Sequence, residues 1–195
     1  MKIIIHNIIA PYRTPLFDAL SKIEEEEVLI LYIKRKDSLR KWDQNSNNLK
    51  HKHKFLKTIS FNNINFSIDL ITTLLSKKPK EVICLDDNSN VINFFAVWVL
   101  KFFTGYKLIS WFGIFEDKND SYIYKLLKQL RKRIYRRVDS VWSYSKGSTS
   151  YLTESLGFDI KFISEGLQGY PYQLIPSFPI SDIERRFEHN KYIYI

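Results

Sequence analysis

The sequence is poor in the residues that mark several specialised protein classes. Among 195 residues there is one cysteine, Cys84, and one methionine, with six glycines and six prolines. A lone cysteine excludes an internal disulfide and favours a reducing compartment, so we expect a cytoplasmic protein. Lys2 leads directly into strand-like residues, so we expect no secretory leader. The longest apolar stretch, 91–103, contains Asn93 and Lys101 and is too short to span a bilayer, which predicts a soluble or peripheral protein.

Acidic residues are in the minority, and the formal net charge is +9. This balance favours acidic partners such as lipid headgroups or phosphates. No motif for base stacking or groove reading is present, so we do not expect nucleic acid as a partner. The four histidines make no convincing metal set, because His51 and His53 share a strand face without a carboxylate or cysteine nearby in the sequence. We therefore expect no metal.

Strand and helix signals alternate from one end of the chain to the other. This alternation is typical of βαβ units and predicts an α/β fold, Rossmann-like, with a mainly parallel sheet and helices on both faces. With 45% hydrophobic residues the chain can bury a substantial core. The expected strands are 2–9, 28–33, 51–59, 81–85, 107–111, 140–144 and 160–163. The first expected helix starts at Pro15, and the later ones cover 67–77, 90–103, 121–138 and 146–156.

The most informative segment is the loop 10–15 after the first strand, with the sequence Ala-Pro-Tyr-Arg-Thr-Pro. Such loops lie at the carboxyl edge of a parallel sheet, where open α/β folds bind their ligands. This placement makes Tyr12 and Arg13 candidate ligand contacts. The alternative is an ordinary connection with a solvated Arg13. His6, in the preceding strand, is interpreted as a packed, hydrogen-bonded residue, with a minor role at the ligand site left open.

A second polar group, Asp86-Asp87-Asn88, follows the strand 81–85. Paired acids at this edge are suited to binding hydroxyl groups of a ligand. The alternative, which we favour, is that they cap the following helix.

Three segments together resemble the N-terminal half of a GT-B glycosyltransferase, of the large group of retaining enzymes called family 4. The most specific segment is 7–17, Asn-Ile-Ile-Ala-Pro-Tyr-Arg-Thr-Pro-Leu-Phe. The others are 141–145, Val-Trp-Ser-Tyr-Ser, with the helix end Ser-Leu-Gly at 155–157, and the segment 159–166, Asp-Ile-Lys-Phe-Ile-Ser-Glu-Gly. The resemblance covers nearly the whole chain.

The resemblance implies that this half holds the acceptor, whereas a second domain holds the nucleotide sugar. Tyr12 and Arg13 would then contact the acceptor or its phosphate, with Asp86, Trp111 and Glu116 lining the cleft. Many family members have a histidine after the strand corresponding to 107–111, and this sequence has none there. A polar role would pass to Glu116 or Asp117, unless these residues only cap the next helix. No cofactor is implied beyond the nucleotide sugar as co-substrate.

The resemblance also sets the expected domain organisation. Residues 1–180 would form the acceptor-binding domain, and 181–195 the linker and first strand of a donor domain that is missing or truncated. The alternative is that 191–195 is an edge strand or tail of a complete protein. A separate chain could supply the donor domain.

The expected helix 121–138 combines an apolar stripe with a dense basic face. A solvated face is the ordinary interpretation, but basic residues near aromatic ones also suit an anionic membrane surface. The candidate membrane-facing residues are Lys125, Lys128, Lys132, Arg133 and Arg136.

The sequence therefore predicts a glycosyltransferase-like protein, inactive by itself, that serves retaining transfer from a nucleotide sugar to a lipid-linked or polysaccharide acceptor. Peripheral binding at the inner face of the membrane fits this hypothesis. The alternative is a non-catalytic basic module that docks on an anionic membrane or on a partner subunit with a donor domain.

Overall fold

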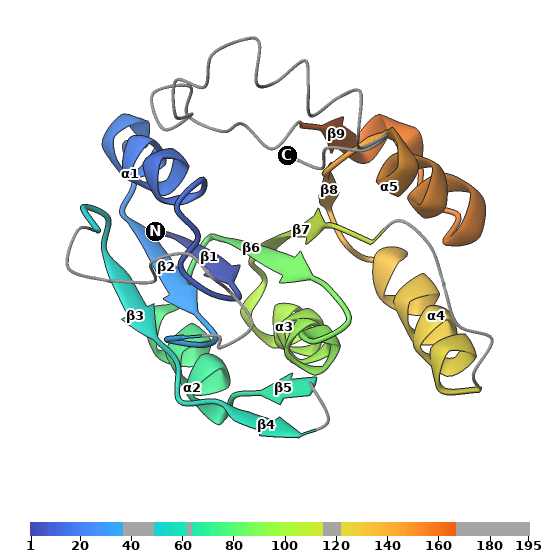
Figure 1. Ribbon diagram of the computed structural model, residues 1–195, viewed down its shortest axis with the longest axis horizontal. Coiled ribbons are helices and arrows are strands. Elements are labelled where there is room, and N and C mark those ends of the chain that lie inside the picture. Colours follow the sequence, from blue (N-terminus) through green and yellow to red (C-terminus); the bar gives the residue numbers. More distant parts are fainter. Residues whose placement is uncertain (37–48, 62–63, 115–121, 167–195) are drawn as a thin grey trace, which may run out of the picture.

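The computed structural model describes residues 1–36, 49–61, 64–114 and 122–166, which build a seven-stranded sheet with helices packed on it (Figure 1). The strand order is β3-β2-β1-β6-β7-β8-β9, and every neighbouring pair is parallel. The mainly parallel, Rossmann-like α/β fold is thus confirmed. The strands are β1 (Lys2–His6), β2 (Val28–Tyr32), β3 (His53–Phe55), β6 (Glu81–Asp86), β7 (Lys107–Phe112), β8 (Ser140–Ser143) and β9 (Ile163–Glu165).

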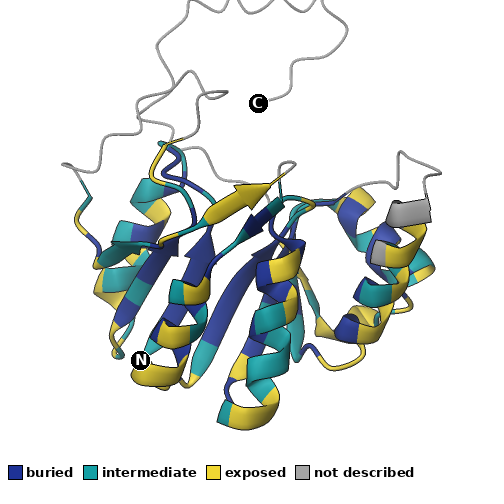
Figure 2. Cartoon of the chain, turned by 90° about the horizontal axis from the view of Figure 1, so that it is seen from below, coloured by how far each residue is buried: buried dark blue, intermediate teal, exposed yellow. Residues whose placement is uncertain are grey.

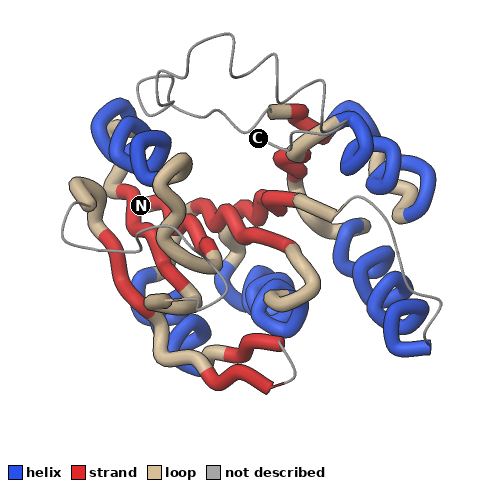
Figure 3. The backbone as a smooth tube through the Cα atoms, viewed as in Figure 1, coloured by secondary structure: helices blue, strands red, loops and turns tan. Residues whose placement is uncertain are grey.

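Figure 3 shows the helices in blue, and two of their ends have a clear local cause. Pro15 lies in the first turn of α1, where its missing N–H leaves no hydrogen bond unmade. Gly105 ends α3 in the left-handed conformation, with φ 73°, and its N–H reaches the carbonyl of Lys101. The helices are α1 (Thr14–Ile23), α2 (Ile68–Lys77), α3 (Val91–Thr104), α4 (Tyr122–Tyr135) and α5 (Lys146–Ser150).

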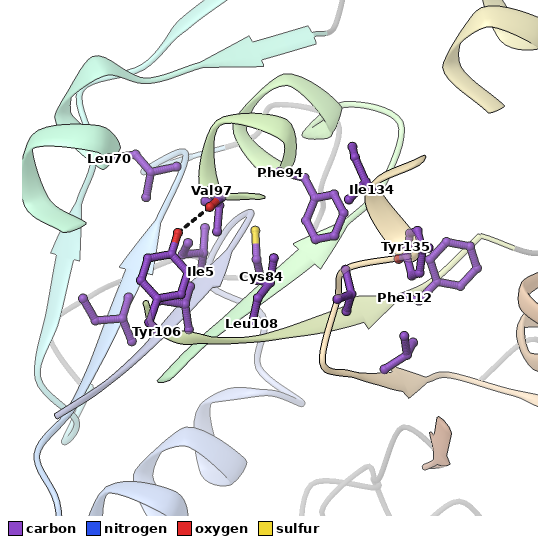
Figure 4. Close-up of a cluster of buried hydrophobic side chains, with 14 of the residues drawn as sticks. Ile5, Leu70, Cys84, Phe94, Val97, Tyr106, Leu108, Phe112, Ile134 and Tyr135 are labelled. Carbon is purple, nitrogen blue, oxygen red and sulfur yellow. Dashed lines mark hydrogen bonds between the residues drawn. The ribbon is translucent and has the colours of Figure 1, made fainter. Parts of the chain in front are cut away.

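The larger part of the core lies between the sheet and the helices α2, α3 and α4 (Figure 4). Phe94 and Val97 of α3 pack on Cys84 and neighbouring strand residues, and the Tyr106 hydroxyl donates to the carbonyl of Val97. Figure 2 shows the central strands largely in dark blue, between helices whose outward faces carry exposed residues. Each Å² of apolar surface buried in this layer contributes about 25 cal/mol to the stability of the fold. The layer is therefore the main stabilising contact.

The opposite face of the sheet carries a smaller core around α1. Phe17 is fully buried there against Ile30 and Tyr32, and Trp111 of β7 belongs to the same cluster. Trp142 and Tyr144 lie at the margin of this cluster and are only partly buried. The side chains that concern function gather on this face.

Two strand predictions were wrong in detail. The expected strand 51–59 is divided: β3 joins the main sheet, and β4 (Ile59–Phe61) pairs antiparallel with β5 (Ile64–Phe66) in a separate hairpin. The expected strand 160–163 is instead a 3₁₀ turn over Ile160–Phe162, because the Asp159 carboxylate accepts the Lys161 N–H at 3.1 Å, and β9 starts only at Ile163.

The expected helix 146–156 is also irregular. α5 ends at Ser150 and continues as one π-helical turn, Tyr151–Ser155. The segments 38–48 and 181–195 lie outside the described residues. Within the ranges that the structure describes, every helix is too short or too polar to cross a membrane.

Candidate functional site

The candidate site lies at the carboxyl edge of the sheet, beside the point where the strand order reverses. The chain passes from β1 towards β2, but from β6 in the opposite direction, towards β7. In open α/β sheets this switch point is where ligands bind. Here the two loops are joined, because Asn7 after β1 donates its amide N–H to the Asp87 carboxylate after β6.

Arg13 is the central residue of this edge. Its side chain is only 4% exposed, and its guanidinium carbon lies 4.1 Å from the ring centroid of Trp111, 4.9 Å from Tyr144 and 5.3 Å from Tyr12. One terminal N–H donates to the Tyr144 hydroxyl at 2.7 Å. We call these four residues the Arg13 cage. The cage stabilises the cation through the ring faces.

The Arg13 cage supplies no negative charge. In the described part of the chain, no carboxylate comes within ion-pair distance of Arg13, and its Nε has no hydrogen-bond partner. The Asn7 side-chain oxygen, at the same edge, is also buried without a partner. Buried polar groups are nearly always hydrogen-bonded, so an unpaired donor and an unpaired acceptor at one edge indicate a place for a polar ligand.

Tyr144 reaches Arg13 because a glycine makes room for its ring. A Cβ added to Gly113 would lie 2.3 Å from the Tyr144 ring, closer than any real contact. The Tyr144 ring therefore rests on the backbone after β7. Burial raises the pKa of the Tyr144 hydroxyl to about 12, while the Arg13 charge acts in the opposite direction. The hydroxyl stays protonated and can donate to a ligand while it accepts from Arg13.

His6 ends β1 directly beneath this cage. It is 5% exposed, and its Nδ1 lies 3.0 Å from the carbonyl of Ile8, to which it donates in the neutral form. Burial, together with the positive charge of Arg13, lowers the pKa of His6 to about 3. The interpretation of His6 as a packed, hydrogen-bonded residue is confirmed. Its imidazole is neutral at physiological pH and adds no second charge to the site.

Asp86 lies fully buried at the end of β6, on the other side of the sheet from Arg13. Its carboxylate forms an ion pair with Arg131 of α4 at 3.3 Å and accepts a hydrogen bond from the Tyr135 hydroxyl at 3.0 Å. Burial raises the pKa of Asp86, and the Arg131 guanidinium opposes this shift. Helix capping by Asp86 was a wrong interpretation: the N-cap of α3 is Asn90, and no side chain makes a cap hydrogen bond there. We assign Asp86 to holding α4 on the sheet.

The structure places the remaining candidate residues in different surroundings. Trp111 is 4% exposed and stacks on Trp142 with ring centroids 5.2 Å apart, so it supports Arg13 from below. Glu116 and Asp117 lie outside the described residues. On α4, Lys128 is half-buried with its Nζ 5.6 Å from the Tyr151 ring. Exposed basic residues of this segment are Lys125, Lys132, Arg133 and Arg136.

Sequence reasoning gave no role to Tyr144, Asn7 or Arg131. For Tyr144 the only signal was its position at the end of a parallel strand, because its partner is 131 residues away. For Arg131 a usable signal existed. It precedes buried Ile134 and Tyr135 by three and four residues, which places it on the apolar stripe of α4 rather than on the basic face. No group of three metal-ligating side chains comes together within the described ranges.

The sequence matches no protein-family model and no curated protein. The fold does have counterparts among solved structures. One is Anabaena Alr3699/HepE in complex with UDP and glucose, with a TM-score of 0.63 and 10% identity, covering 97% of this chain and 50% of that chain. Another is a glycosyltransferase from Rickettsia africae, with a TM-score of 0.58 and 13% identity, covering 96% of this chain and 48% of that one. The chain thus has the Rossmann-like fold of GT-B glycosyltransferases and spans about half of their length.

Proposed function

We propose that this chain is the acceptor-binding half of a glycosyltransferase. The reaction would transfer a sugar from a nucleotide sugar to a lipid-linked or polysaccharide acceptor. Retention at the anomeric carbon is proposed from the sequence resemblance alone. The donor sugar would be bound by a second domain, and transfer would require both domains.

The observation that carries the proposal is the buried positive charge of Arg13, which has no counter-charge in the described residues. A buried cation is costly unless it is paired. An anionic group of an acceptor, such as a diphosphate, would supply the pairing. It would accept from the free Nε of Arg13 and from the Tyr144 hydroxyl, in charge-assisted hydrogen bonds stronger than neutral ones. The aromatic rings of the cage would exclude water from this contact.

Asn7 supports the same proposal with a different chemistry. Its buried side-chain oxygen can accept a hydrogen bond from a hydroxyl of the acceptor. Asp87 holds the Asn7 amide in place, and Asp87 is itself fixed by the N–H and hydroxyl of Ser89, at 2.9 and 2.8 Å. Two fixed groups, one for an anion and one for a hydroxyl, match an acceptor that carries a sugar next to a phosphate.

Calorimetric titration separates an acceptor site from a donor site. We expect farnesyl diphosphate, a short lipid diphosphate, to bind at least about tenfold more tightly than UDP-glucose, a difference of ~1.4 kcal/mol. Lys22→Met, which removes an exposed charge on α1, serves as a control and should bind like the parent chain. Tighter binding of UDP-glucose would contradict the acceptor assignment.

The second candidate function is a non-catalytic basic module that docks on an anionic membrane or on a subunit with a donor domain. The net charge of +9 favours it. If neither farnesyl diphosphate nor UDP-glucose binds, this alternative replaces the first proposal.

A further inference from the structure

Helix α3 carries a strip of apolar side chains on the side turned away from the sheet. Its inward residues, among them Phe94 and Val97, are fully buried, as a helix on a sheet requires. The outward ones are exposed, up to 79% at Phe103. We define the α3 strip as the exposed residues Ile92, Phe95, Phe102 and Phe103 together with Trp98, which is half-buried and also packs against the core.

Three rings of the α3 strip, those of Phe95, Trp98 and Phe102, are in contact with one another along the helix. Phe95 stacks on Trp98 with centroids 5.6 Å apart, and Trp98 meets Phe102 edge to face at 5.0 Å. The strip therefore forms a connected aromatic surface rather than scattered single residues. Contiguous exposed apolar surface of this kind marks an interaction site more often than isolated residues do.

The strip borders the basic end of α4. The guanidinium of Arg137 lies 5.4 Å from the Phe102 ring centroid, and the Lys101 ammonium donates to the Arg137 carbonyl at 2.8 Å. Arg133 lies one helical turn before Arg137 and is exposed, as are Lys132 and Arg136. An aromatic surface on α3 thus adjoins a row of exposed cations at the end of α4 and in the turn that follows it.

Neither helix contains an acidic residue: α3 reads VINFFAVWVLKFFT and α4 reads YIYKLLKQLRKRIY. The nearby Asp139 is neutralised by Lys101 at 2.7 Å. Exposed aromatic side chains flanked by charges of one sign fit the interface of a bilayer, where the rings enter the headgroup region and the cations meet anionic lipid. A protein partner would require an equally one-sided acidic and apolar face.

We propose that the α3 strip and the exposed basic residues at the end of α4 form a docking surface for anionic lipid bilayers. The rings of Phe95, Phe102 and Phe103 enter the interfacial layer, and Lys132, Arg133 and Arg136 bind lipid phosphates. This surface extends the membrane-facing assignment from α4 to the outer face of α3. It is independent of the ligand that Arg13 binds.

Vesicle co-sedimentation of the full chain tests the proposal. We expect the chain to sediment with vesicles made of equal parts of phosphatidylcholine and phosphatidylglycerol, and to remain in solution with phosphatidylcholine alone. Phe103→Ser and Arg136→Glu should each weaken binding by about tenfold, because the first reduces the apolar contribution and the second the electrostatic one. The matched controls are Ile23→Ser, 75% exposed on α1, and Lys22→Glu, also on α1; both should bind like the parent chain.

Several outcomes would overturn the proposal. Absence of binding to the mixed vesicles would do so, as would equal losses for the α1 controls and the α3 and α4 variants. An unchanged affinity for Phe103→Ser would mean that the rings stay out of the bilayer. A dimer in vesicle-free buffer that Phe103→Ser converts to a monomer would assign the strip to a second copy of the chain. Arg13→Met should keep full vesicle binding, so that this test and the test of acceptor binding fail separately.

Discussion

Among the residues that the structure describes, two arginines are buried, and their surroundings differ. Arg131 is 1% exposed and pairs with the Asp86 carboxylate, whereas Arg13 is 4% exposed and faces three aromatic rings, with no carboxylate of the described residues in ion-pair distance. The charge of Arg131 is neutralised by Asp86 within the fold, and this ion pair fixes α4 to β6. Arg13 leaves a positive charge and an unpaired Nε at the ligand edge. The difference distinguishes a structural charge from one available for binding.

The largest effect should follow from Arg131→Met. This change leaves Asp86 buried without its partner, and breaking a buried pair on one side costs about 3–5 kcal/mol of unfolding free energy. Urea unfolding followed by circular dichroism measures the loss. If the pair is what stabilises α4, the double variant Asp86→Leu with Arg131→Met should recover most of the lost stability. A single variant as stable as the parent chain would remove Arg131 from this role.

A smaller effect concerns His6, whose neutral form is favoured first by burial and then by the charge of Arg13. The folded-state pKa of His6 is about 3, against an ordinary value of 6.5. Below pH 6.5 the unfolded chain therefore binds a proton that the folded chain rejects. The His6 contribution is complete above pH 6.5 and is lost at ~1.4 kcal/mol per pH unit as the pH falls towards 3.

His6→Asn keeps a side-chain donor for the Ile8 carbonyl but does not titrate. We expect the stability difference between the parent and His6→Asn to shift by ~2 kcal/mol between pH 7 and pH 5, measured by urea unfolding at each pH. In the Arg13→Met background the folded-state pKa of His6 should be higher, so proton uptake by the folded chain should begin at a higher pH. The same pH dependence in parent and His6→Asn chains would show that His6 is not held neutral.

Gly113→Ala should have a smaller effect on stability and a visible one at the cage. The added methyl group overlaps the Tyr144 ring, which is half-buried and can turn outward. We expect a loss of about 1–2 kcal/mol and a weaker Arg13–Tyr144 contact. Gly157→Ala is a useful control for backbone strain, because Gly157 has φ 70° and open space around it. Unaltered farnesyl diphosphate binding in Gly113→Ala would show that the Tyr144 position is unimportant.

The fold was predictable because it depends on local patterns repeated along the chain. Alternating apolar runs gave the parallel sheet, and Pro15 and Gly105 marked helix ends correctly. Short elements without periodicity were missed, as the β4–β5 hairpin shows. At the candidate site, the position of the loop 10–15 indicated Arg13 and Tyr12 as ligand contacts. Tyr144 was not found in this way, because it lies next to them only through the order of the strands in the folded sheet. The ion pair of Asp86 was missed because Arg131 was grouped with the basic face of its helix, although its spacing to Ile134 and Tyr135 places it on the apolar stripe.

The most direct test of the unpaired charge is calorimetric titration of Arg13→Met with farnesyl diphosphate. If Arg13 binds the anion, affinity should fall by about 10- to 100-fold, as expected for the loss of a charge-assisted hydrogen bond. The unfolding free energy of Arg13→Met should change by less than about 1 kcal/mol, since no buried carboxylate loses its partner. Unchanged affinity, or a stability loss as large as that of Arg131→Met, would contradict the assignment of Arg13 as the binding charge.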